Sequence, residues 1–234
     1  IIDKNLIKNE RIISNYTYLT IIKILKDLFN QNLIKSVIQI GSNDGQRFDN
    51  LNYFIKKYKP KAIFVEPIKS NFEDLKNNYI NHDNLNFVNA AISVNNEIQE
   101  LFKVKQSKLH LYDEHVIGIT SFDKKHLIKH GVSKNHIEIE KVESISIINL
   151  LKKYSINNFD LLFIDTEGYD SNIVLDFLMN SEIRPIIIFE YIHTNFESLN
   201  KTLELLKNKK YILFKIEENI ICIPDENKDR LKIF

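Results

Sequence analysis

Carboxylates and a histidine follow two apolar stretches in the second half of the chain. They are Asp165 and Glu167 after residues 161–164, and Glu190 and His193 after residues 185–189. A short uncharged apolar run is typical of a buried strand in a parallel sheet. The carboxyl ends of such strands meet at one edge of the sheet, where ligands bind, so we expect these side chains to share one cleft. Carboxylates and an imidazole there could accept a proton or hold a metal ion.

A turn with two glycines follows the apolar residues 37–40. It consists of Gly41, Ser42, Asn43, Asp44 and Gly45. Glycine lets the backbone turn sharply and lets a ligand approach main-chain amides. The spacing fits neither the dinucleotide fingerprint nor a P-loop. The acid Asp44 suits a ligand with positive charge, such as S-adenosylmethionine, better than a pyrophosphate. A glycine turn with no ligand is the alternative interpretation.

Another acid, Glu66, follows the apolar residues 62–65 and lies about 20 residues beyond the glycine turn. A carboxylate at this place in a nucleotide-binding sheet accepts hydrogen bonds from ribose hydroxyls. We prefer this role to that of a solvated acid at a strand end, because the glycine turn and the acid are separated by the expected interval.

Strand and helix patterns alternate along most of the chain, which predicts right-handed βαβ units and a parallel sheet. The predicted strands are 37–40, 62–66, 85–93, 161–164, 185–189, 211–216 and 219–223. The predicted helices are 15–30, one that directly follows the glycine turn and ends near residue 59, 69–79, 147–154, 171–179 and 196–208. The last two strands are expected to form an antiparallel hairpin at the edge of the sheet.

Two segments lie outside this alternation. The amphipathic helix 15–30 belongs to an N-terminal extension, 1–34, and is expected to pack on the sheet; a lid or a homodimer contact is the alternative. Residues 97–141 form an insertion in which 101–104 could be an edge strand. Its histidines are His110, His115, His126, His130 and His136. Their spacing matches no zinc-binding motif, so we prefer an insertion that shapes a substrate pocket to a metal site.

Composition restricts the class of protein. The chain has 234 residues, of which 44% are hydrophobic and 27% are charged, and its net charge is +1. These values predict a single globular domain and give no overall field for binding nucleic acid. The single cysteine, Cys222, excludes an internal disulfide, and no signal peptide or membrane-spanning run is visible. We therefore expect a cytoplasmic protein.

Four stretches in the same order resemble the FkbM-type S-adenosylmethionine-dependent methyltransferases, over about residues 35–215. They are the glycine turn, Val-Glu-Pro at 65–67, Asn-Ala-Ala-Ile-Ser at 89–93 and Ile-Asp-Thr-Glu-Gly-Tyr-Asp at 164–170. The resemblance implies an α/β, Rossmann-like class I methyltransferase fold. It has a seven-stranded, mostly parallel sheet with an antiparallel last strand and helices on both faces. It also implies methyl transfer, commonly to a hydroxyl of a sugar, polysaccharide component or natural product.

The resemblance assigns roles to individual residues. Cofactor-binding residues would be Gly41, Ser42, Asn43, Asp44 and Gly45 for the methionine part, Glu66 and Pro67 beside the ribose, Asn89 and Ala90 at the adenine, and Asp165. Asp165 and Glu167 would face the methyl-transfer site. Asp170 stands where the family more often has glutamate, and residues 103–136 have no counterpart that we can align.

Methyl transfer needs an acceptor oxygen in line with the sulfonium methyl group and a base for its proton. Our hypothesis is that Glu167 or His193 takes the proton while Asp165 orients cofactor or substrate. A variant places Mg²⁺ on Asp165, Glu167 and Glu190. The alternatives are a small-molecule N-methyltransferase and a non-catalytic S-adenosylmethionine-binding or scaffold domain. The near-zero net charge disfavours a nucleic-acid substrate.

Overall fold

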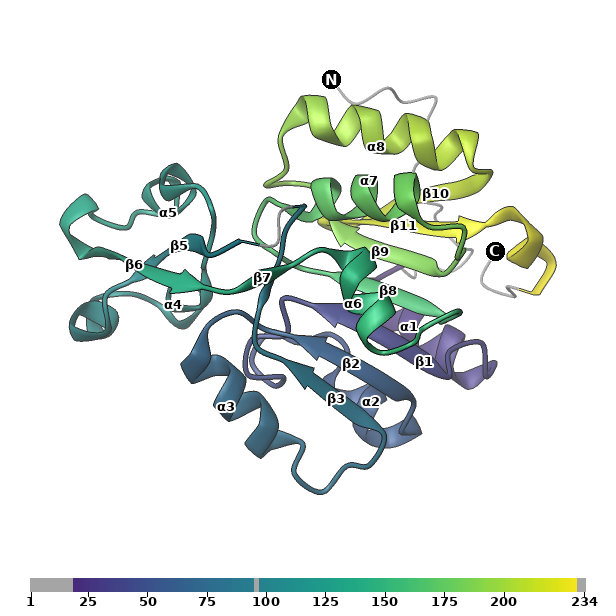
Figure 1. Cartoon of the computed structure of the whole chain (residues 1–234), viewed down its shortest axis with the longest axis horizontal. Coiled ribbons are helices and arrows are strands. Elements are labelled where there is room, and N and C mark those ends of the chain that lie inside the picture. Colours follow the sequence, from purple (N-terminus) through teal and green to yellow (C-terminus); the bar gives the residue numbers. More distant parts are fainter. Residues whose placement is uncertain (1–18, 95–96, 231–234) are drawn as a thin grey trace.

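The computed structural model describes residues 19–94 and 97–230, so the part of the N-terminal extension before residue 19 lies outside the described residues. The strands of the main sheet are β1 (Ser36–Ile40), β2 (Lys61–Val65), β3 (Leu85–Val88), β8 (Leu161–Ile164), β9 (Ile186–Glu190), β10 (Tyr211–Ile216) and β11 (Asn219–Pro224). Their spatial order is β10-β11-β9-β8-β1-β2-β3 (Figure 1). β11 runs antiparallel to β9 and β10, and the other six strands are parallel to one another. The predicted fold class is confirmed.

The register of the central strands brings the sequence motifs together. Ile40, the last residue of β1, is paired with Val65 of β2 on one side and with Ile164 of β8 on the other. The pairing continues beyond the strands, since Gly41 N–H donates to the carbonyl of Val65 and Asp165 N–H donates to that of Ile40. The glycine turn, Glu66 and Asp165 therefore start at the same edge of the sheet.

Helices cover both faces of the sheet. One face is covered by α1 (Ile21–Asn30), α2 (Asn52–Tyr58) and α3 (Lys69–Asn78), and the other by α6 (Ile147–Lys153), α7 (Asp170–Asn180) and α8 (Phe196–Asn208). Helix α8 has the predicted bounds, and it starts where the Asn195 side chain accepts hydrogen bonds from two backbone amides. Helix α1 packs on the sheet as predicted, but residues 19 and 20 of the predicted helix 15–30 precede its first residue, Ile21, and residues 15–18 lie outside the described residues.

Two further predicted elements are wrong in their bounds. No helix directly follows the glycine turn: α2 begins at Asn52, because the Asp44 and Asp49 carboxylates bind the amides of the intervening segment and Phe48 has a φ of 58°. The predicted strand 85–93 is divided at Asn89, whose side-chain amide binds the backbone after β2. Beyond it, β4 (Ala91–Ile92) leaves the sheet and pairs in parallel with β7 (Ser144–Ile145).

The insertion forms a lobe beside the main sheet, on the left of Figure 1. It is built from the antiparallel pair β5 (Gln99–Val104) and β6 (Ile137–Val142), the helices α4 (Glu114–Gly118) and α5 (Lys124–Lys129), and the 3-10 turns η1 (Gln106–Leu111) and η2 (Lys134–His136). Residues 101–104 thus pair with β6 and not with the edge of the main sheet. The lobe has its own small core of Val104, Val116, Ile119, Leu127, Val132 and Ile137.

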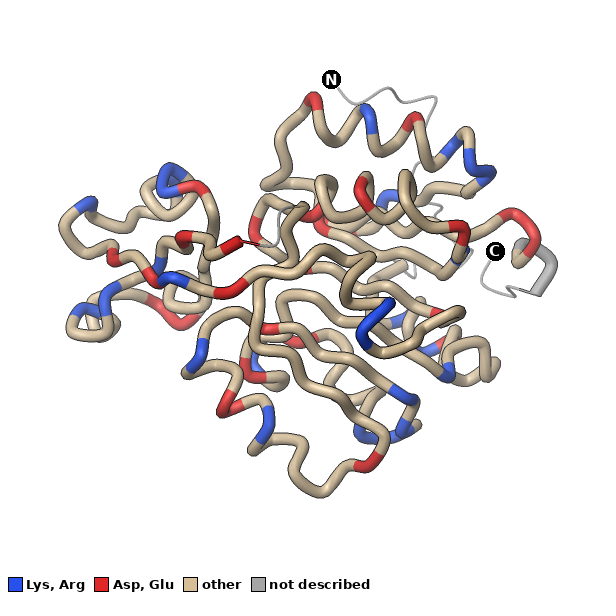
Figure 2. Tube along the Cα trace, in the orientation of Figure 1, with Lys and Arg blue, Asp and Glu red and all other residues tan. Residues whose placement is uncertain are grey.

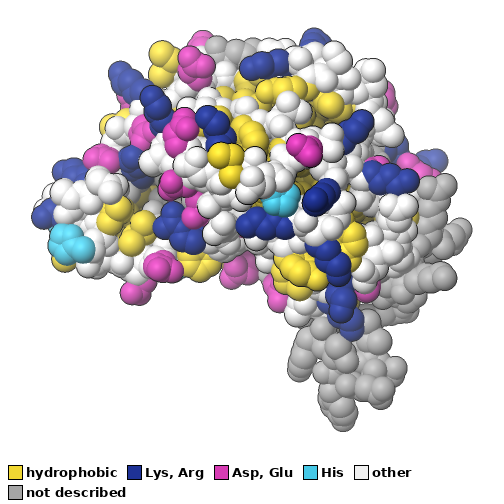
Figure 3. Space-filling model, turned by 90° about the horizontal axis from the view of Figure 1, so that it is seen from below, with side chains coloured by type: hydrophobic (Ala, Val, Ile, Leu, Met, Phe, Trp, Pro, Cys, Tyr) yellow, Lys and Arg dark blue, Asp and Glu magenta, His cyan; other side chains and the backbone are white. Residues whose placement is uncertain are grey.

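The surface carries basic and acidic side chains in a mixed distribution, as the net charge of +1 suggests. Basic and acidic residues are interspersed along the described trace (Figure 2), and the face seen in Figure 3 mixes both signs with apolar side chains. Several Lys and Arg side chains lie near one another right of the centre of that face, next to apolar side chains. Within the described residues, every helix is too short or too polar to span a bilayer.

Candidate active site

A cavity of about 470 Å³ lies at the carboxyl ends of the central strands, within the size range of small-molecule sites. It reaches from the glycine turn to the insertion lobe. Its acidic lining residues are Asp49, Glu66, Asp165, Glu167, Glu190 and Glu218, and Arg47 is the arginine among the lining residues. The cavity is therefore suited to a ligand that carries positive charge.

Most of the residues predicted from the sequence line this cavity. They are Gly41, Ser42, Asn43, Glu66, Pro67, Ala90, Asp165, Glu167, Glu190 and His193. Asp44, Gly45 and Asn89 lie outside the lining. In this structure Asp44 accepts hydrogen bonds from the amides of Gln46 and Arg47 and from Arg47 Nε at 2.6 Å. Burial raises the pKa of Asp44, but these donors outweigh it, so the pKa lies below its ordinary value.

The two glycines of the turn are required by protein packing. A Cβ atom on Gly41, whose φ is +79°, would lie 1.7 Å from the carbonyl oxygen of Asp165. A Cβ atom on Gly45 would lie 2.6 Å from the side chains of Leu75 and Tyr79. Gly41 thus allows the chains that leave β1 and β8 to touch, and this contact positions Asp165 at the cavity.

Glu66 is fixed by backbone donors. Its two carboxylate oxygens accept from the amides of Asn43 and Ile68, each at 2.9 Å, and only 4% of the residue is exposed. Burial raises the pKa of Glu66 to about 7, against the effect of these two amides. The side chain of Asn71 also donates to this carboxylate, which keeps capacity to accept from a ligand hydroxyl. Asn89 Nδ2 supports the same segment by donating to the carbonyls of Glu66 and Pro67.

The turn after β8 presents Asp165 and Glu167 to the cavity. Asp170, fully buried, accepts from Thr166 N–H, Thr166 Oγ1 and Gly168 N–H, which holds the turn closed. Glu167 has a left-handed φ of 54°, and its carbonyl accepts from Ser121 Oγ of the insertion at 3.0 Å. Strained backbone of this kind concentrates at functional sites.

Several titratable groups face one another around Glu167. The side chain of Asp165 is exposed to the cavity, but the protein that surrounds it on the other sides keeps bulk water away. Burial raises its pKa, and the neighbouring Asp170 and Glu167 raise it further. Burial, then Asp165 and Asp170, raise the pKa of Glu190 to about 10.

The carboxylates predicted to bind metal are only partly brought together. Among the described residues, Glu167 and Glu190 group with His193, each offering a ligand atom within 4.8 Å of the others, and Asp165 is outside this group. His193 Nε2 lies 3.8 Å from Glu190 Oε1.

The sequence missed two contributors. His126 lies in the insertion, and its Nε2 is 3.0 Å from Glu167 Oε2. In the sequence, the number of histidines in the insertion was the feature that could have drawn attention to it. Asp49 lies where a helix was expected, and its Oδ1 accepts from Leu51 N–H and Gln39 Nε2. Asp49 Oδ2 and Gln39 Oε1 are buried and have no hydrogen-bond partner among the described residues, and both side chains line the cavity.

The pKa of Asp49 predicts a pH effect on stability. Burial raises it from 3.8 to about 6, so the folded chain keeps a proton that the unfolded chain has released. The resulting stability is present below pH 3.8 and lost as the pH rises through about 6. Asp49→Asn should remove this loss and be more stable than the original chain at pH 8, by at most about 3 kcal/mol.

Urea unfolding at pH 4 and pH 8 measures this difference. Asp74→Asn, at an exposed position on α3, is the matched control and should leave the pH dependence unchanged. An Asp49→Asn curve with the same loss between the two pH values as the original chain would contradict the assignment.

Comparison with known proteins agrees with the resemblance seen in the sequence. A model of the methyltransferase FkbM domain matches residues 39–213. No curated protein matches the chain. A solved methyltransferase FkbM from Methylobacillus flagellatus KT is 10% identical, with a TM-score of 0.47, over 81% of this chain and 44% of that one. The METTL16 MTase domain is 13% identical, with a TM-score of 0.47, over 86% of this chain and 65% of that one.

The chain thus spans less than two thirds of the length of these two solved chains. At such identities and TM-scores the likeness assigns no property to this chain. The family match is different, because it covers most of the described residues and every strand-end motif discussed above. The chain belongs to the FkbM methyltransferase family.

Proposed function

We propose that the chain transfers a methyl group from S-adenosylmethionine to a hydroxyl of a sugar, polysaccharide component or natural product. The observation that carries this proposal is the acid-lined cavity at the strand ends, with Glu66 fixed by two amides at the end of β2. The sulfonium and α-amino groups of this cofactor are positively charged, which matches that lining.

The lining suggests how the cofactor would lie. Glu66 would accept hydrogen bonds from the ribose hydroxyls, and Ala90 would lie beside the adenine. The methionine part would extend past Gly41 toward Asp49, whose unpaired Oδ2 offers an acceptor for the α-amino group. Arg47, half-exposed at the cavity, would attract the cofactor carboxylate.

The chemistry then needs positioning and one proton acceptor. As the acceptor oxygen attacks the methyl carbon, the carbon–oxygen bond forms, the carbon–sulfur bond breaks and S-adenosylhomocysteine leaves. We assign the hydroxyl proton to Glu167, which His126 orients from 3.0 Å. His193 is the alternative base. Burial and then His126 lower the pKa of His193, so its imidazole is neutral at neutral pH.

The insertion would supply the acceptor side of the site. Leu101, His115, Ile119, Thr120 and Phe122 line the same cavity. They mix apolar and polar groups and face the strand ends that carry Glu167. We therefore propose that residues 97–141 contribute to the substrate pocket.

Binding of S-adenosylhomocysteine tests the cofactor assignment. Calorimetric titration of the whole chain should show one site, and Glu66→Gln should weaken binding by about 10- to 100-fold, because one acceptor oxygen is replaced by a donor. Glu73→Gln, on the outer face of α3, should bind as the original chain does. A folded chain that binds no S-adenosylhomocysteine would refute the proposal, as would unchanged affinity in Glu66→Gln.

A further inference from the structure

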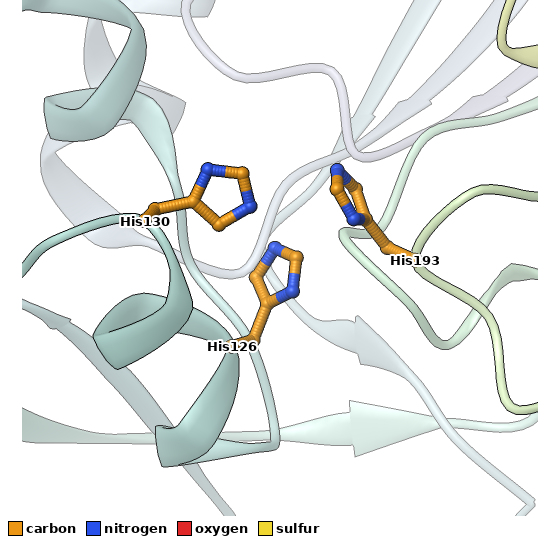
Figure 4. Close-up of side chains that lie close together, drawn as sticks. All are labelled: His126, His130 and His193. Carbon is orange, nitrogen blue, oxygen red and sulfur yellow. The ribbon is translucent and has the colours of Figure 1, made fainter.

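Three histidines converge at the edge of the cavity. His126 lies on α5, His130 directly follows α5, and His193 lies in the loop after β9. The ring centroids of His126 are 4.7 Å from His130 and 4.4 Å from His193, and those of His130 and His193 are 5.1 Å apart. Figure 4 shows the three rings pointing toward one another from two sides. Each offers a nitrogen, and these nitrogens lie within 4.8 Å of one another.

Separate parts of the fold position these rings. The four-residue spacing of His126 and His130 places them on one face of the helical turn, and His130 N–H donates to the carbonyl of His126. Leu127 between them is buried in the core of the lobe. His193 comes from the main domain, where its carbonyl packs against Gly168. The cluster therefore joins the insertion to the strand ends.

Packing of three aromatic rings is the simpler explanation of the cluster, but it does not account for the carboxylate of Glu167 on His126.

That carboxylate is the second observation. Glu167 Oε2 lies 3.0 Å from His126 Nε2. This nitrogen is the one that faces His130 and His193 in Figure 4, so an ion bound there would replace its proton and would have the carboxylate of Glu167 beside it. Three imidazoles with one open position are a catalytic zinc ligand set, whereas Mg²⁺ prefers oxygen ligands.

We propose that His126, His130 and His193 bind one divalent transition-metal ion, such as Zn²⁺, with the carboxylate of Glu167 beside the ion. Ligands 2.0–2.1 Å from a tetrahedral ion lie about 3.4 Å apart, so the rings must close by roughly 1 Å on binding. His130 and His193 line the cavity, which leaves the fourth position open toward it.

An ion there would take an acceptor oxygen as its fourth ligand and lower the pKa of that hydroxyl. This role rests on the proposed methyltransferase function, whereas binding of the ion does not. The substrate class that fits is an alcohol whose oxygen can reach both the ion and Glu167.

Metal titration of the full chain, with no S-adenosyl compound present, tests the site. After treatment with a chelator, calorimetry with Zn²⁺ and visible absorption with Co²⁺ should show one ion per chain. His130→Ala and His193→Ala should each weaken binding at least 100-fold, and Glu167→Gln should weaken it about 10- to 100-fold. His110→Ala, at an exposed position in the same lobe, should bind as the original chain does.

Three results would overturn the site, with folding of every variant checked by circular dichroism. They are no saturable binding by the original chain, unchanged binding in both histidine variants, or binding that survives His130→Ala but is lost in Glu190→Gln. A parallel titration with S-adenosylhomocysteine separates the two proposals. A chain that binds S-adenosylhomocysteine but no metal refutes only the metal site, and the converse refutes only the proposed cofactor.

Discussion

Replacing Gly41 with alanine should destabilise the fold by about 4 kcal/mol. The new Cβ atom would lie 1.7 Å from the Asp165 carbonyl oxygen, so β1 and β8 would have to separate at the site. The backbone at φ +79° adds strain for any residue with a Cβ atom. This loss is a large share of the roughly 5–15 kcal/mol that stabilises a typical domain. Urea unfolding of the variant and the original chain measures it.

Gly131→Ala is a matched control. Gly131 has a φ of +85°, but a Cβ atom there would meet nothing within 4 Å. Its substitution should cost only the backbone strain, about 1 kcal/mol. Equal losses for the two variants would show that backbone conformation, and not the contact with Asp165, makes glycine necessary at position 41.

Glu167→Gln should lower kcat about 10²- to 10⁴-fold while binding of S-adenosylhomocysteine is retained. Glutamine keeps the shape of the side chain and an oxygen that can face His126. Its amide is not basic enough to take the proton from the hydroxyl of the substrate that is methylated. Release of S-adenosylhomocysteine, measured with and without added Zn²⁺, gives the rate, and calorimetry gives the affinity.

Two further variants make this result specific. Glu182→Gln changes an almost fully exposed carboxylate and should leave kcat unaltered. His193→Gln tests the alternative base. If Glu167→Gln keeps the original rate and His193→Gln loses it, the proton acceptor is His193 and our assignment of Glu167 is wrong.

The sequence predicted best those elements that depend on short-range patterns. The apolar run 161–164 is β8, and the periodic apolar residues of 196–208 are α8 with the same bounds. The acids at the strand ends could be placed at one edge of the sheet, because the carboxyl ends of parallel strands lie at the same edge. Glu66, Asp165 and Glu167 reach the cavity for this reason.

Side-chain interactions of the local turns were not predictable in the same way. Asp44 looked like a ligand-binding acid, yet it binds the amides that follow it. Asn89 likewise binds backbone carbonyls. A polar side chain beside a turn can bind either the backbone or a ligand, depending on the conformation of the turn. The spacing of residues in the sequence does not reveal that conformation.

Long-range contacts were the hardest to predict. His126 and Glu167 are separated by 41 residues, and nothing in either local pattern indicates the other. Their contact depends on how the lobe returns to the sheet through the pairing of β4 with β7. The sequence showed that the lobe is rich in histidines, but it did not predict that two of them lie beside His193.

The position of β11 between β9 and β10 has a consequence for biosynthesis. β9 contains the buried apolar residues 186–189, and its free edge is covered only when residues 219–222 pair with it. During translation this edge stays open until β11 leaves the ribosome, although β10 is made earlier. An unpaired apolar edge invites pairing with other chains. β9 is therefore open to pairing with other chains until residues 219–222 have been made and are in place.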